Sequence, residues 1–201
     1  MTSDTARRAA HEAHFDALFS TDPDPWAYRT SAAERAKRRA VRASLGRRLA
    51  RGLEIGCGNG ESTADLAQAF LDLQAIDASP VAVSLARERV NHITGCKVAI
   101  ARLPEDIPTG PFNAVIATEV LYYLPLVPLR RTLNAIREEL TIGGRFVLTG
   151  SIRPFGDRDV SHGVLFREAA RVFGPPRRTI SGGAWRADLF VRSRRSGLMA
   201  W

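Results

Sequence analysis

The sequence predicts an α/β domain in which helices cover both faces of a mostly parallel, doubly wound sheet. From residue 52 onward, short apolar runs of strand length alternate with longer runs that have the apolar spacing of helices. The first apolar run, GLEIG, leads directly into glycines at positions 56, 58 and 60. The last two extended runs are separated by SGGAW, which is typical of a β-hairpin turn. A parallel sheet that ends in an antiparallel hairpin accounts for these observations.

The first 50 residues are predicted to form two helices that precede the sheet. Phe15 and Phe19 give the first helix an apolar face, and STDPDPWAYRT ends the helical pattern. Ser31 and Glu34 make the S-x-x-E pattern of a capping box, which predicts a helix start at this position. We expect this second helix to end at Gly46, because glycine commonly follows a helix C-terminus. The segment is interpreted as a helical cap and lid, residues 1–50.

The rest of the chain, residues 51–201, is predicted to form the α/β core of the same single domain. Five strands are expected at residues 52–56, 73–77, 97–101, 112–118 and 145–150. Helices are expected in ESTADLAQAF, VAVSLARERV, PLRRTLNAIREEL and VLFREAARVF. Ser79 and Pro80 support the start of the second of these helices, and Gly143-Gly144 is expected to close the third. RRTI and RADLFVRS are then the strands of the final hairpin.

The composition excludes several classes of protein. With 45% hydrophobic and 25% charged residues, the chain has the composition of an ordinary globular domain. We expect a cytoplasmic protein without a membrane partner, because no apolar run could span a bilayer and MTSDTARRAAHEAHF lacks the apolar stretch of a secretory signal. Cys57 and Cys96 are the only cysteines, and they predict neither a disulfide framework nor a zinc site.

The formal net charge of +8 is compatible with a nucleic-acid partner. Only Lys37 and Lys97 are lysines, so the many arginines and alanines indicate coding bias in a GC-rich genome. The densest basic run, RAKRRAVRASLGRRLAR at residues 35–51, is interpreted as the solvated face of a helix, since no aromatic RNA-binding signature accompanies it. We therefore expect no nucleic-acid partner, and RNA methylation through this helix remains an alternative.

The glycines after the first strand predict a ligand-binding turn. In an open α/β sheet, ligands bind beyond the carboxyl ends of the strands, where the strand order reverses. Glycine lets the backbone approach a ligand closely there. The dinucleotide fingerprint is G-x-G-x-x-G, whereas here the third glycine comes one residue early and Glu61 follows it. Acids at Glu54 and Glu61 disfavour a diphosphate and favour a ligand with an ammonium or sulfonium group.

Asp77 is the second feature of the predicted ligand site. It ends the second strand, about twenty residues after the turn, where a carboxylate can accept hydrogen bonds from both ribose hydroxyls. An ordinary polar strand end is the alternative interpretation of Asp77. The combination of a glycine turn with an acid at this place predicts a ligand that contains a nucleoside.

These features together resemble the class I methyltransferases that use S-adenosyl-L-methionine (SAM). The resemblance rests on E-x-G-x-G-x-G after the first strand, the acid that ends the second strand and the closing hairpin, and it covers residues 52 to about 194. It implies a Rossmann-like sheet with strand order 3-2-1-4-5-7-6, in which the last strand is antiparallel. It also implies that SAM is the cofactor and lies over the first, second and fourth strands.

The resemblance assigns residues to the cofactor. The backbone of Gly56 and Gly58 would lie along the methionine part of SAM, Glu54 would meet its amino group, and Asp77 would bind the ribose. Leu103 stands where many members of the family carry an acid that bonds adenine, so we expect packing and backbone groups to hold the base. Three further residues are assigned to the cofactor site, namely Cys57, Ala78 and Thr118.

The N-terminal third narrows the resemblance. DPWAYRTSAAERAKRR, followed later by TEVLYYLPLV, is similar to the nodulation protein S (NodS)-like group, whose members N-methylate the deacetylated glucosamine end of a chitin oligosaccharide. In the related enzymes this segment lies over the SAM pocket. The resemblance implies that Trp26 and Tyr28 form a lid and that Lys37 meets the SAM carboxylate. The alternative is a segment that only packs on the sheet.

Three residues after the fourth strand are the candidates for catalysis: Glu119, Tyr122 and Tyr123. Methyl transfer to a free amine mainly requires that the amine be held in line with the methyl group, whereas a hydroxyl acceptor usually needs a general base as well. Glu119 would bind a substrate ammonium or accept its proton, and a helix-capping acid is the alternative role. One of the two tyrosines is expected to pack into the core.

The sequence therefore predicts a SAM-dependent methyltransferase that N-methylates an amine of a small molecule or an amino sugar, such as a chitooligosaccharide. His11 and His14 lie three residues apart on a helix without an evident third ligand, so no metal is expected. The alternatives are O-methylation of a specialised metabolite with Glu119 or His162 as base, methylation of RNA, and a SAM-binding module without catalysis.

Overall fold

The computed structural model describes residues 3–153, 156 and 158–194, and its strands form one seven-stranded sheet. The strands are β1 (Leu49–Ile55), β2 (Phe70–Asp77), β3 (Cys96–Ile100), β4 (Phe112–Thr118), β5 (Leu140–Ser151), β6 (Arg178–Ser181) and β7 (Trp185–Val191). Their order in the sheet is β3-β2-β1-β4-β5-β7-β6. Only β7 runs antiparallel to its neighbours β5 and β6. The predicted fold class, strand order and antiparallel last strand are confirmed.

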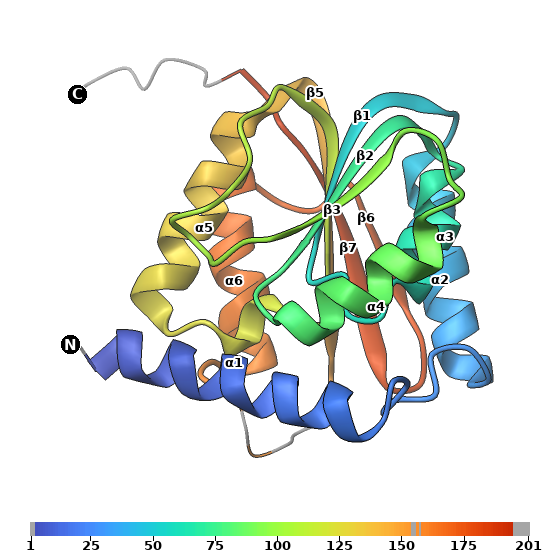
Figure 1. Ribbon diagram of the computed structural model, residues 1–201. Coiled ribbons are helices and arrows are strands. Elements are labelled where there is room, and N and C mark those ends of the chain that lie inside the picture. The colour runs from blue at the N-terminus through green and yellow to red at the C-terminus, as the bar shows by residue number, and fades with distance from the viewer. Residues whose placement is uncertain (1–2, 154–155, 157, 195–201) are drawn as a thin grey trace.

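Helices lie on both faces of this sheet (Figure 1). The helices are α1 (Ser3–Thr21), α2 (Ala32–Leu45), α3 (Glu61–Ala67), α4 (Pro80–Val90), α5 (Leu126–Glu139) and α6 (His162–Phe173), and a short 3-10 helix, η1 (Leu121–Tyr123), follows β4. Figure 1 shows α5 and α6 on one side of the sheet and α2, α3 and α4 on the other. The first helix, α1, belongs to neither layer and crosses one edge of the sheet (Figure 1).

Apolar side chains fill the space between the layers. On the side of α5 and α6, Phe146 and Phe190 of the sheet pack with Phe173 of α6, with ring centroids 5.0–6.0 Å apart. On the opposite side, Val41 of α2 and Leu66 of α3 join one cluster with the sheet, and α4 joins another. The buried sheet explains why its central strands are continuous apolar runs rather than alternating ones.

The two N-terminal helices form as predicted, and the start of α2 has only half of a capping box. The Ser31 hydroxyl accepts a hydrogen bond from the Glu34 backbone N–H at 3.3 Å. The Glu34 carboxylate does not return to the backbone of Ser31, because it is bonded to Lys37 Nζ at 2.9 Å. Gly46 ends the helix with φ 68°, a left-handed value that favours glycine.

The predicted helix after the glycine turn is too long by three residues. Helix α3 ends at Ala67, and Phe70 opens strand β2 instead of closing the helix. Phe70 pairs with Leu49 in the parallel ladder, which also places the start of β1 three residues earlier than predicted. Its ring is 2% exposed and lies over Gly52, where any Cβ would stand 2.5 Å from the Phe70 ring. Burial of this ring in the sheet outweighs its fit to the helical pattern.

The predicted stop signal Gly143-Gly144 lies inside a strand. Helix α5 ends at Glu139, and β5 begins at Leu140 and continues through both glycines. The pairing with β4 shifts register between Leu140 and Arg145, so the glycines occupy a bulge, with φ 80° at Gly143. Glycine marks an irregular strand here rather than the end of a helix.

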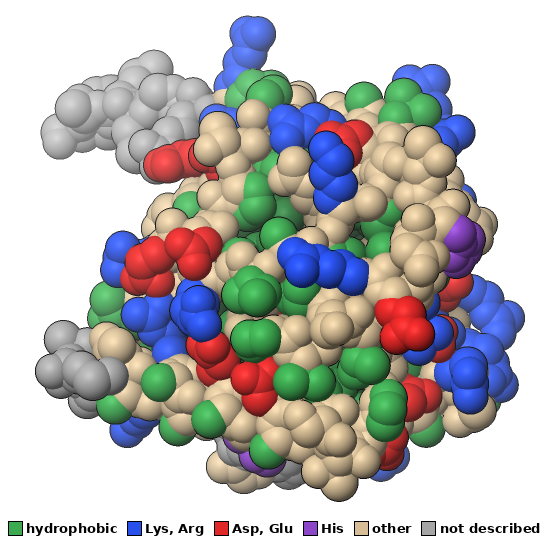
Figure 2. All heavy atoms as spheres, viewed as in Figure 1, with side chains coloured by type: hydrophobic (Ala, Val, Ile, Leu, Met, Phe, Trp, Pro, Cys, Tyr) green, Lys and Arg blue, Asp and Glu red, His purple; other side chains and the backbone are tan. Residues whose placement is uncertain are grey.

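The basic run at residues 35–51 covers most of α2 and the start of β1. Lys and Arg side chains gather over α2 in the space-filling view (Figure 2). Within the described residues, no helix is long and apolar enough to cross a membrane. The last seven residues of the predicted core, 195–201, lie outside the described part of the chain.

Candidate active site

Two adjoining cavities lie where strands β1, β2 and β4 end at their carboxyl termini. The smaller one measures about 410 Å³ and the larger one about 520 Å³. Gly56 and Asp77 line both cavities, as do Phe15 of α1, Val120 and Tyr123. The N-terminal helices, the loop between them and η1 complete the walls, so the site lies at the edge of the sheet where the sequence predicted a ligand.

The glycine turn after β1 has a backbone conformation that favours glycine at all three of its positions, and two of them are also closely packed. All three have left-handed φ values, which are 77° at Gly56, 51° at Gly58 and 82° at Gly60. A Cβ on Gly56 would stand 2.7 Å from Val120, and one on Gly60 would stand 2.8 Å from the backbone of Ala86. A Cβ on Gly58 would meet no described atom closer than 3.4 Å. Gly56 and Gly60 thus serve packing, whereas a Cβ on Gly58 would be in ordinary contact with the Phe19 and Tyr28 rings in the wall of the larger cavity.

Asp77 fastens the glycine turn to the end of β2. Its Oδ2 accepts the backbone N–H of Gly58 at 2.9 Å, and its Oδ1 accepts that of Ser79 at 3.0 Å. Burial raises the pKa of the Asp77 carboxyl, and these backbone hydrogen bonds act in the opposite direction. A carboxylate has about four acceptor positions, so Asp77 keeps capacity for two hydroxyl donors from the cavities that it lines.

The smaller cavity is mostly apolar. Leu103 and Ala78 line it, together with Ile55 and Ile76 from the strand ends. Asp106 also reaches its wall, but one of its carboxylate oxygens already accepts the backbone N–H of Arg102 at 3.0 Å. A flat, weakly polar group such as a purine base fits walls of this kind.

Helix α1 roofs the smaller cavity and is held by polar contacts on both flanks. On one side Glu12 forms an ion pair with Arg102, and Asp16 accepts the Ser79 hydroxyl at 2.5 Å. On the other side His11 Nε2 lies 3.1 Å from Asp159 Oδ2. Acidic and basic side chains lie next to each other along this edge of the molecule (Figure 2). These contacts set the position of the roof over the strand ends.

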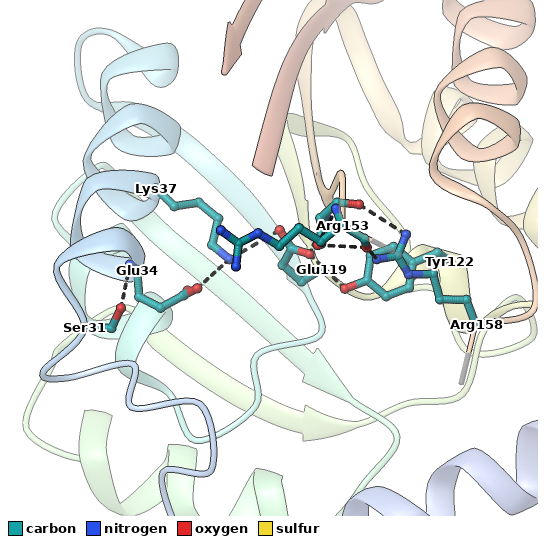
Figure 3. Close-up of polar contacts among 8 residues, drawn as sticks. Ser31, Glu34, Lys37, Glu119, Tyr122, Arg153 and Arg158 are labelled. Carbon is teal, nitrogen blue, oxygen red and sulfur yellow. Dashed lines mark hydrogen bonds and ion pairs between the residues drawn. The ribbon is translucent and has the colours of Figure 1, made fainter. Parts of the chain in front are cut away.

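Glu119 is the centre of a polar cluster in the larger cavity (Figure 3). Its Oε1 accepts Lys37 Nζ at 3.3 Å, and its Oε2 accepts the Tyr122 hydroxyl at 2.8 Å and the Ser151 backbone N–H at 2.7 Å. Lys37 is 4% exposed and also pairs with Glu34. Glu119 has φ 57°, a left-handed value that is uncommon for a residue with a side chain and is found at functional sites.

The structure distinguishes the two candidate tyrosines. Tyr122 is 3% exposed and belongs to the core, and the guanidinium of Arg158 lies 4.8 Å from its ring centroid. Burial and the neighbouring Glu119 raise the pKa of the Tyr122 hydroxyl, which therefore stays protonated and donates to that carboxylate. Tyr123 lines both cavities and packs edge-on against Phe15, with centroids 4.9 Å apart. Tyr122 is thus the core residue of the pair.

Aromatic rings from the loop between α1 and α2 form a further wall of the larger cavity. Trp26 packs edge-on against Phe19 of α1 and lies 5.5 Å from Tyr28, centroid to centroid. Both loop residues line the cavity together with Trp185 from the other end of the chain. Burial raises the pKa of the Tyr28 hydroxyl, so this ring is neutral. The predicted lid residues therefore stand at the cavity, whereas their contact with a cofactor remains a prediction.

Three predicted cofactor residues differ in how they stand toward the cavities. Thr118 lines the larger cavity, and its Oγ1 is buried without a hydrogen-bond partner among the described residues. Cys57 packs its side chain into the cluster under α4, so only its backbone faces the turn. Glu54 is fully buried and lines neither large cavity. Burial raises the pKa of the Glu54 carboxyl to about 7, against the opposing effect of the Thr63 and Ser62 hydroxyls.

Three of the histidines that the sequence singled out, His11, His14 and His162, contact aromatic or charged side chains. His14 packs edge-on against Phe15, and His11 is bonded to Asp159 as described above. His162 lies at the start of α6 and lines neither large cavity. Burial lowers the pKa of the His162 imidazole, and the positive charge of the neighbouring Arg186 lowers it further. The residues that the structure describes contain no group of three His, Cys, Asp or Glu side chains placed to hold a metal ion.

Sequence analysis did not identify Asn59 as a site residue. It stands between two of the glycines, is 1% exposed, and bonds to the loop that carries Trp26 and Tyr28. Glycines dominate the motif, so their pattern hides the residue between them. The signal in the sequence is an amide residue between two glycines, since a polar side chain that such a turn buries needs hydrogen-bond partners.

Comparisons with known proteins agree with this geometry. The family described as a methyltransferase domain matches residues 53–146. Nodulation protein S of Rhizobium tropici is 31% identical over 106 residues, which make up 52% of this chain and 44% of that protein. The chain spans about half the length of the curated relatives it matches.

Solved structures share the whole fold. The N-methyltransferase NodS from Bradyrhizobium japonicum WM9, in complex with S-adenosyl-L-homocysteine (SAH), has a TM-score of 0.79 and 22% identity, with 91% of this chain and 98% of that chain covered. A methyltransferase described as putative, from Pseudomonas syringae, has a TM-score of 0.71 and 29% identity, with 81% of this chain and 100% of that chain covered. These findings confirm the predicted resemblance to SAM-dependent methyltransferases of the NodS-like group.

Proposed function

We propose that the chain transfers the methyl group of SAM to an amine nitrogen of a small molecule or an amino sugar, on the ground that it resembles SAM-dependent methyltransferases of the NodS-like group. SAM supplies a methyl group bonded to a positively charged sulfur. The protein then has to bind this cofactor, hold the acceptor nitrogen beside it and exclude water.

The walls of the two cavities fit the parts of SAM. The smaller, apolar cavity suits the adenine base, with Leu103 in its wall. Asp77 lies between the cavities, where it can accept the ribose hydroxyls. The backbone of Gly58 and the Thr118 hydroxyl, which has no hydrogen-bond partner among the described residues, both lie in the wall of the larger cavity and suit the methionine part. Together these residues would hold the cofactor across the junction of the cavities.

The charge of the larger cavity carries the proposal that the acceptor is an amine. Its wall contains the carboxylates of Glu34, Asp77 and Glu119, against Lys37 as the one lysine or arginine among the described residues of that wall. The formal charge of these lining side chains is therefore two units negative, and the nearby Arg158 guanidinium lies behind the wall, 4.8 Å from the centroid of the Tyr122 ring. SAM has a sulfonium, an ammonium and a carboxylate, hence one net positive charge, so negative charge remains after it binds. A protonated amine neutralises this charge, whereas a phosphate would be repelled.

Glu119 is the residue that would hold the amine. Three donors already occupy its two oxygens, which leaves about one acceptor position free on Oε1. An ammonium at this position would bond to the carboxylate and pass its proton to Glu119 or to water before the nitrogen accepts the methyl group. Lys37 and the Tyr122 hydroxyl fix the carboxylate, so the acceptor nitrogen would be bound in one orientation.

The relatives support an N-methyltransferase without identifying the acceptor. The solved NodS structure is described as an N-methyltransferase, and the NodS-like resemblance implies an amino sugar as its acceptor. Aromatic rings such as Trp26 and Trp185 in the wall can pack against the face of a sugar or against another apolar body. Both acceptor classes are therefore included in the proposal.

The proposal is tested by incubating the purified protein with tritium-labelled SAM and four acceptor pools: glucosamine oligomers, other small amines, phenols and total RNA. We expect label in an amine pool, with a rate that falls as the pH drops below the pKa of the acceptor amine. Transfer to phenols alone would identify an O-methyltransferase. Transfer to RNA that weakens steeply with added salt would identify an RNA methyltransferase that uses the basic face of α2.

A further inference from the structure

Asn59 joins the glycine turn to the loop between α1 and α2. Its Nδ2 donates to the backbone carbonyl of Pro23 at 2.8 Å and to Asp24 Oδ1 at 3.2 Å. Its Oδ1 accepts the backbone N–H of Glu61 at 3.3 Å, at the start of α3. Asn59 is 1% exposed and lines neither of the two large cavities, so it does not reach an acceptor in the larger one.

The loop at residues 22–30 is organised around Asp24, one of the two partners of Asn59. Asp24 Oδ1 accepts the backbone N–H of Tyr28 at 2.8 Å, and its Oδ2 accepts that of Arg29 at 3.2 Å. Within this turn Ala27 has φ 52°, a left-handed value that costs roughly 1–2 kcal/mol for a residue with a side chain. Such a conformation persists only where surrounding contacts hold it.

These contacts determine where the aromatic wall stands. Trp26 and Tyr28 lie inside the turn that Asp24 closes, and both line the larger cavity. The Tyr28 ring would lie 3.8 Å from a Cβ on Gly58, so it packs directly beside the glycine turn. On its other side the loop is tied to α2, where Arg38 donates to the Tyr28 carbonyl at 2.6 Å.

Among the hydrogen bonds of the described residues, only those of Asn59 join this loop to the glycine turn. We propose that Asn59 is a positioning residue. It fixes the loop that carries the Trp26 and Tyr28 rings, which would form the wall beside the acceptor, relative to the glycine turn that would bind the cofactor. The assignment of the wall to an acceptor rests on the proposed function. The tie itself is a property of the ligand-free chain.

The test changes the donor, Asn59, and one of its acceptors, Asp24, singly and together. Asn59→Asp keeps the oxygen that accepts from Glu61 but places a second carboxylate against Asp24 and the Pro23 carbonyl. Asp24→Asn on its own leaves one oxygen that can accept from Asn59 and Tyr28, but its amide nitrogen cannot accept from the Arg29 N–H. In the double variant the new amide at position 24 can donate to the new carboxylate at position 59, while the Pro23 carbonyl has no donor, so only a partial rescue is expected. Asn134→Asp, the same change on the exposed face of α5, is the matched control.

Amide hydrogen exchange of residues 22–30 in the ligand-free protein is the measurement. We expect about ten- to hundredfold faster exchange in Asn59→Asp, since a hydrogen bond to a charged group is lost, and a comparable increase in Asp24→Asn, since the Arg29 N–H loses its acceptor. The double variant should exchange more slowly than Asn59→Asp, and Asn134→Asp should match the wild type. Exchange of the central strands reports whether every variant is folded.

Two results would overturn the inference: wild-type exchange of the loop in Asn59→Asp, or loop exchange in the Asn134→Asp control that is as fast as in Asn59→Asp. The first would mean that the bonds of Asn59 do not hold the loop, and the second that an added negative charge anywhere on the protein loosens it. Calorimetric titration with SAH separates this inference from the proposed function. Wild-type protein that fails to bind SAH contradicts the function, whatever the loop does.

Discussion

The two cavities that meet at Gly56 and Asp77 are built in different ways. The walls that would hold the cofactor come largely from the ends of neighbouring parallel strands, where backbone N–H groups and glycines make the polar contacts. The acceptor side is assembled from side chains that are distant in sequence, such as Lys37 and Glu119, which are 82 residues apart. A backbone site follows from strand and turn geometry, whereas a side-chain site exists only after the helices have packed.

This difference predicts different consequences of mutation. A substitution in the glycine turn should disturb either folding or cofactor binding, according to where its Cβ points. A substitution of Glu119 in the proposed acceptor cluster should leave buried donors with fewer acceptors. Rings at the rim of the larger cavity should contribute to binding but little to stability. Each of the following changes tests one side of the comparison.

The largest effect is expected within the glycine turn, where two neighbouring glycines should behave differently. Gly60→Val should destabilise the fold by about 3–5 kcal/mol, because its Cβ would collide with the backbone of Ala86 in addition to the cost of its left-handed φ. Gly58→Val should cost only about 1–2 kcal/mol from its left-handed φ, since its Cβ would be in ordinary contact with the Phe19 and Tyr28 rings rather than in collision with backbone. It should nevertheless weaken SAH binding by at least about a hundredfold, a loss of about 2.7 kcal/mol.

Urea denaturation and calorimetry with SAH measure the two quantities separately. If Gly58→Val binds SAH with wild-type affinity, the backbone at this position does not lie against the cofactor. If Gly60→Val is as stable as the wild type, the close approach of α4 to the turn is not required by the fold.

A loss of similar size is expected from the acceptor cluster. Glu119→Ala should lower the free energy of unfolding by about 2–3 kcal/mol, because the Ser151 N–H loses its acceptor and Lys37 keeps Glu34 as its remaining carboxylate. Glu105→Ala is the matched control, since it removes a surface carboxylate that pairs with Arg8 and is 44% exposed. The control should cost at most about 1 kcal/mol. Equal losses in urea denaturation would show that the Glu119 cluster is no more than a surface network.

The buried acid behind the turn predicts a pH effect. The pKa of Glu54 is raised from 4.5 to about 7, so between these values the folded protein holds a proton that the unfolded chain has lost. The free energy of unfolding should therefore fall as the pH rises through this window, by about 3 kcal/mol from this group. Glu54→Gln should remove that part of the slope in urea denaturation series at several pH values.

Binding of SAH tests whether Glu54 belongs to the cofactor site. If the amino group of the cofactor meets Glu54, as the family resemblance implies, binding should favour the ionised carboxylate and release a proton near pH 6. Calorimetry in buffers of different ionisation enthalpy detects that release. Binding without proton release in the wild type would remove Glu54 from the cofactor site and leave it a buried acid of the core.

The smallest effect on stability is expected at the rim of the larger cavity. Trp26 is 39% exposed, so Trp26→Ala should cost less than about 1 kcal/mol in urea denaturation. SAH affinity should change less than about threefold, whereas KM for the methylated amine should rise about tenfold, the loss of roughly 1.4 kcal/mol of ring contacts. A change in SAH affinity with an unchanged acceptor KM would place this ring over the cofactor instead.

The sequence by itself predicted most of the fold and the backbone half of the site. Strand and helix patterns, the Ser31 and Ser79 caps and the Gly46 stop are local signals, and each forms as expected. The resemblance supplied the strand order. Asp77 was recognisable because its distance from the glycine turn is set by one helix and one strand.

Errors occurred where a contact distant in sequence outweighs a local preference. Phe70 continues a helical pattern but is buried over Gly52, and Gly143 resembles a helix stop but occupies a bulge of β5 beside β4. In the same way Glu34 pairs with Lys37 across the first turns of α2 instead of completing the capping box. These outcomes depend on what packs against each residue, which local patterns do not contain.

The sequence by itself determined that a parallel sheet presents a glycine turn and an acid at its carboxyl edge, because both belong to segments whose geometry is local. Only the tertiary structure decided that Glu119 is held by Lys37 and Tyr122, that Asn59 ties the lid loop to the turn, and that Glu54 is buried behind it. The physical reason is that hydrogen bonds, ion pairs and burial between distant residues depend on which surfaces meet when the helices dock on the sheet.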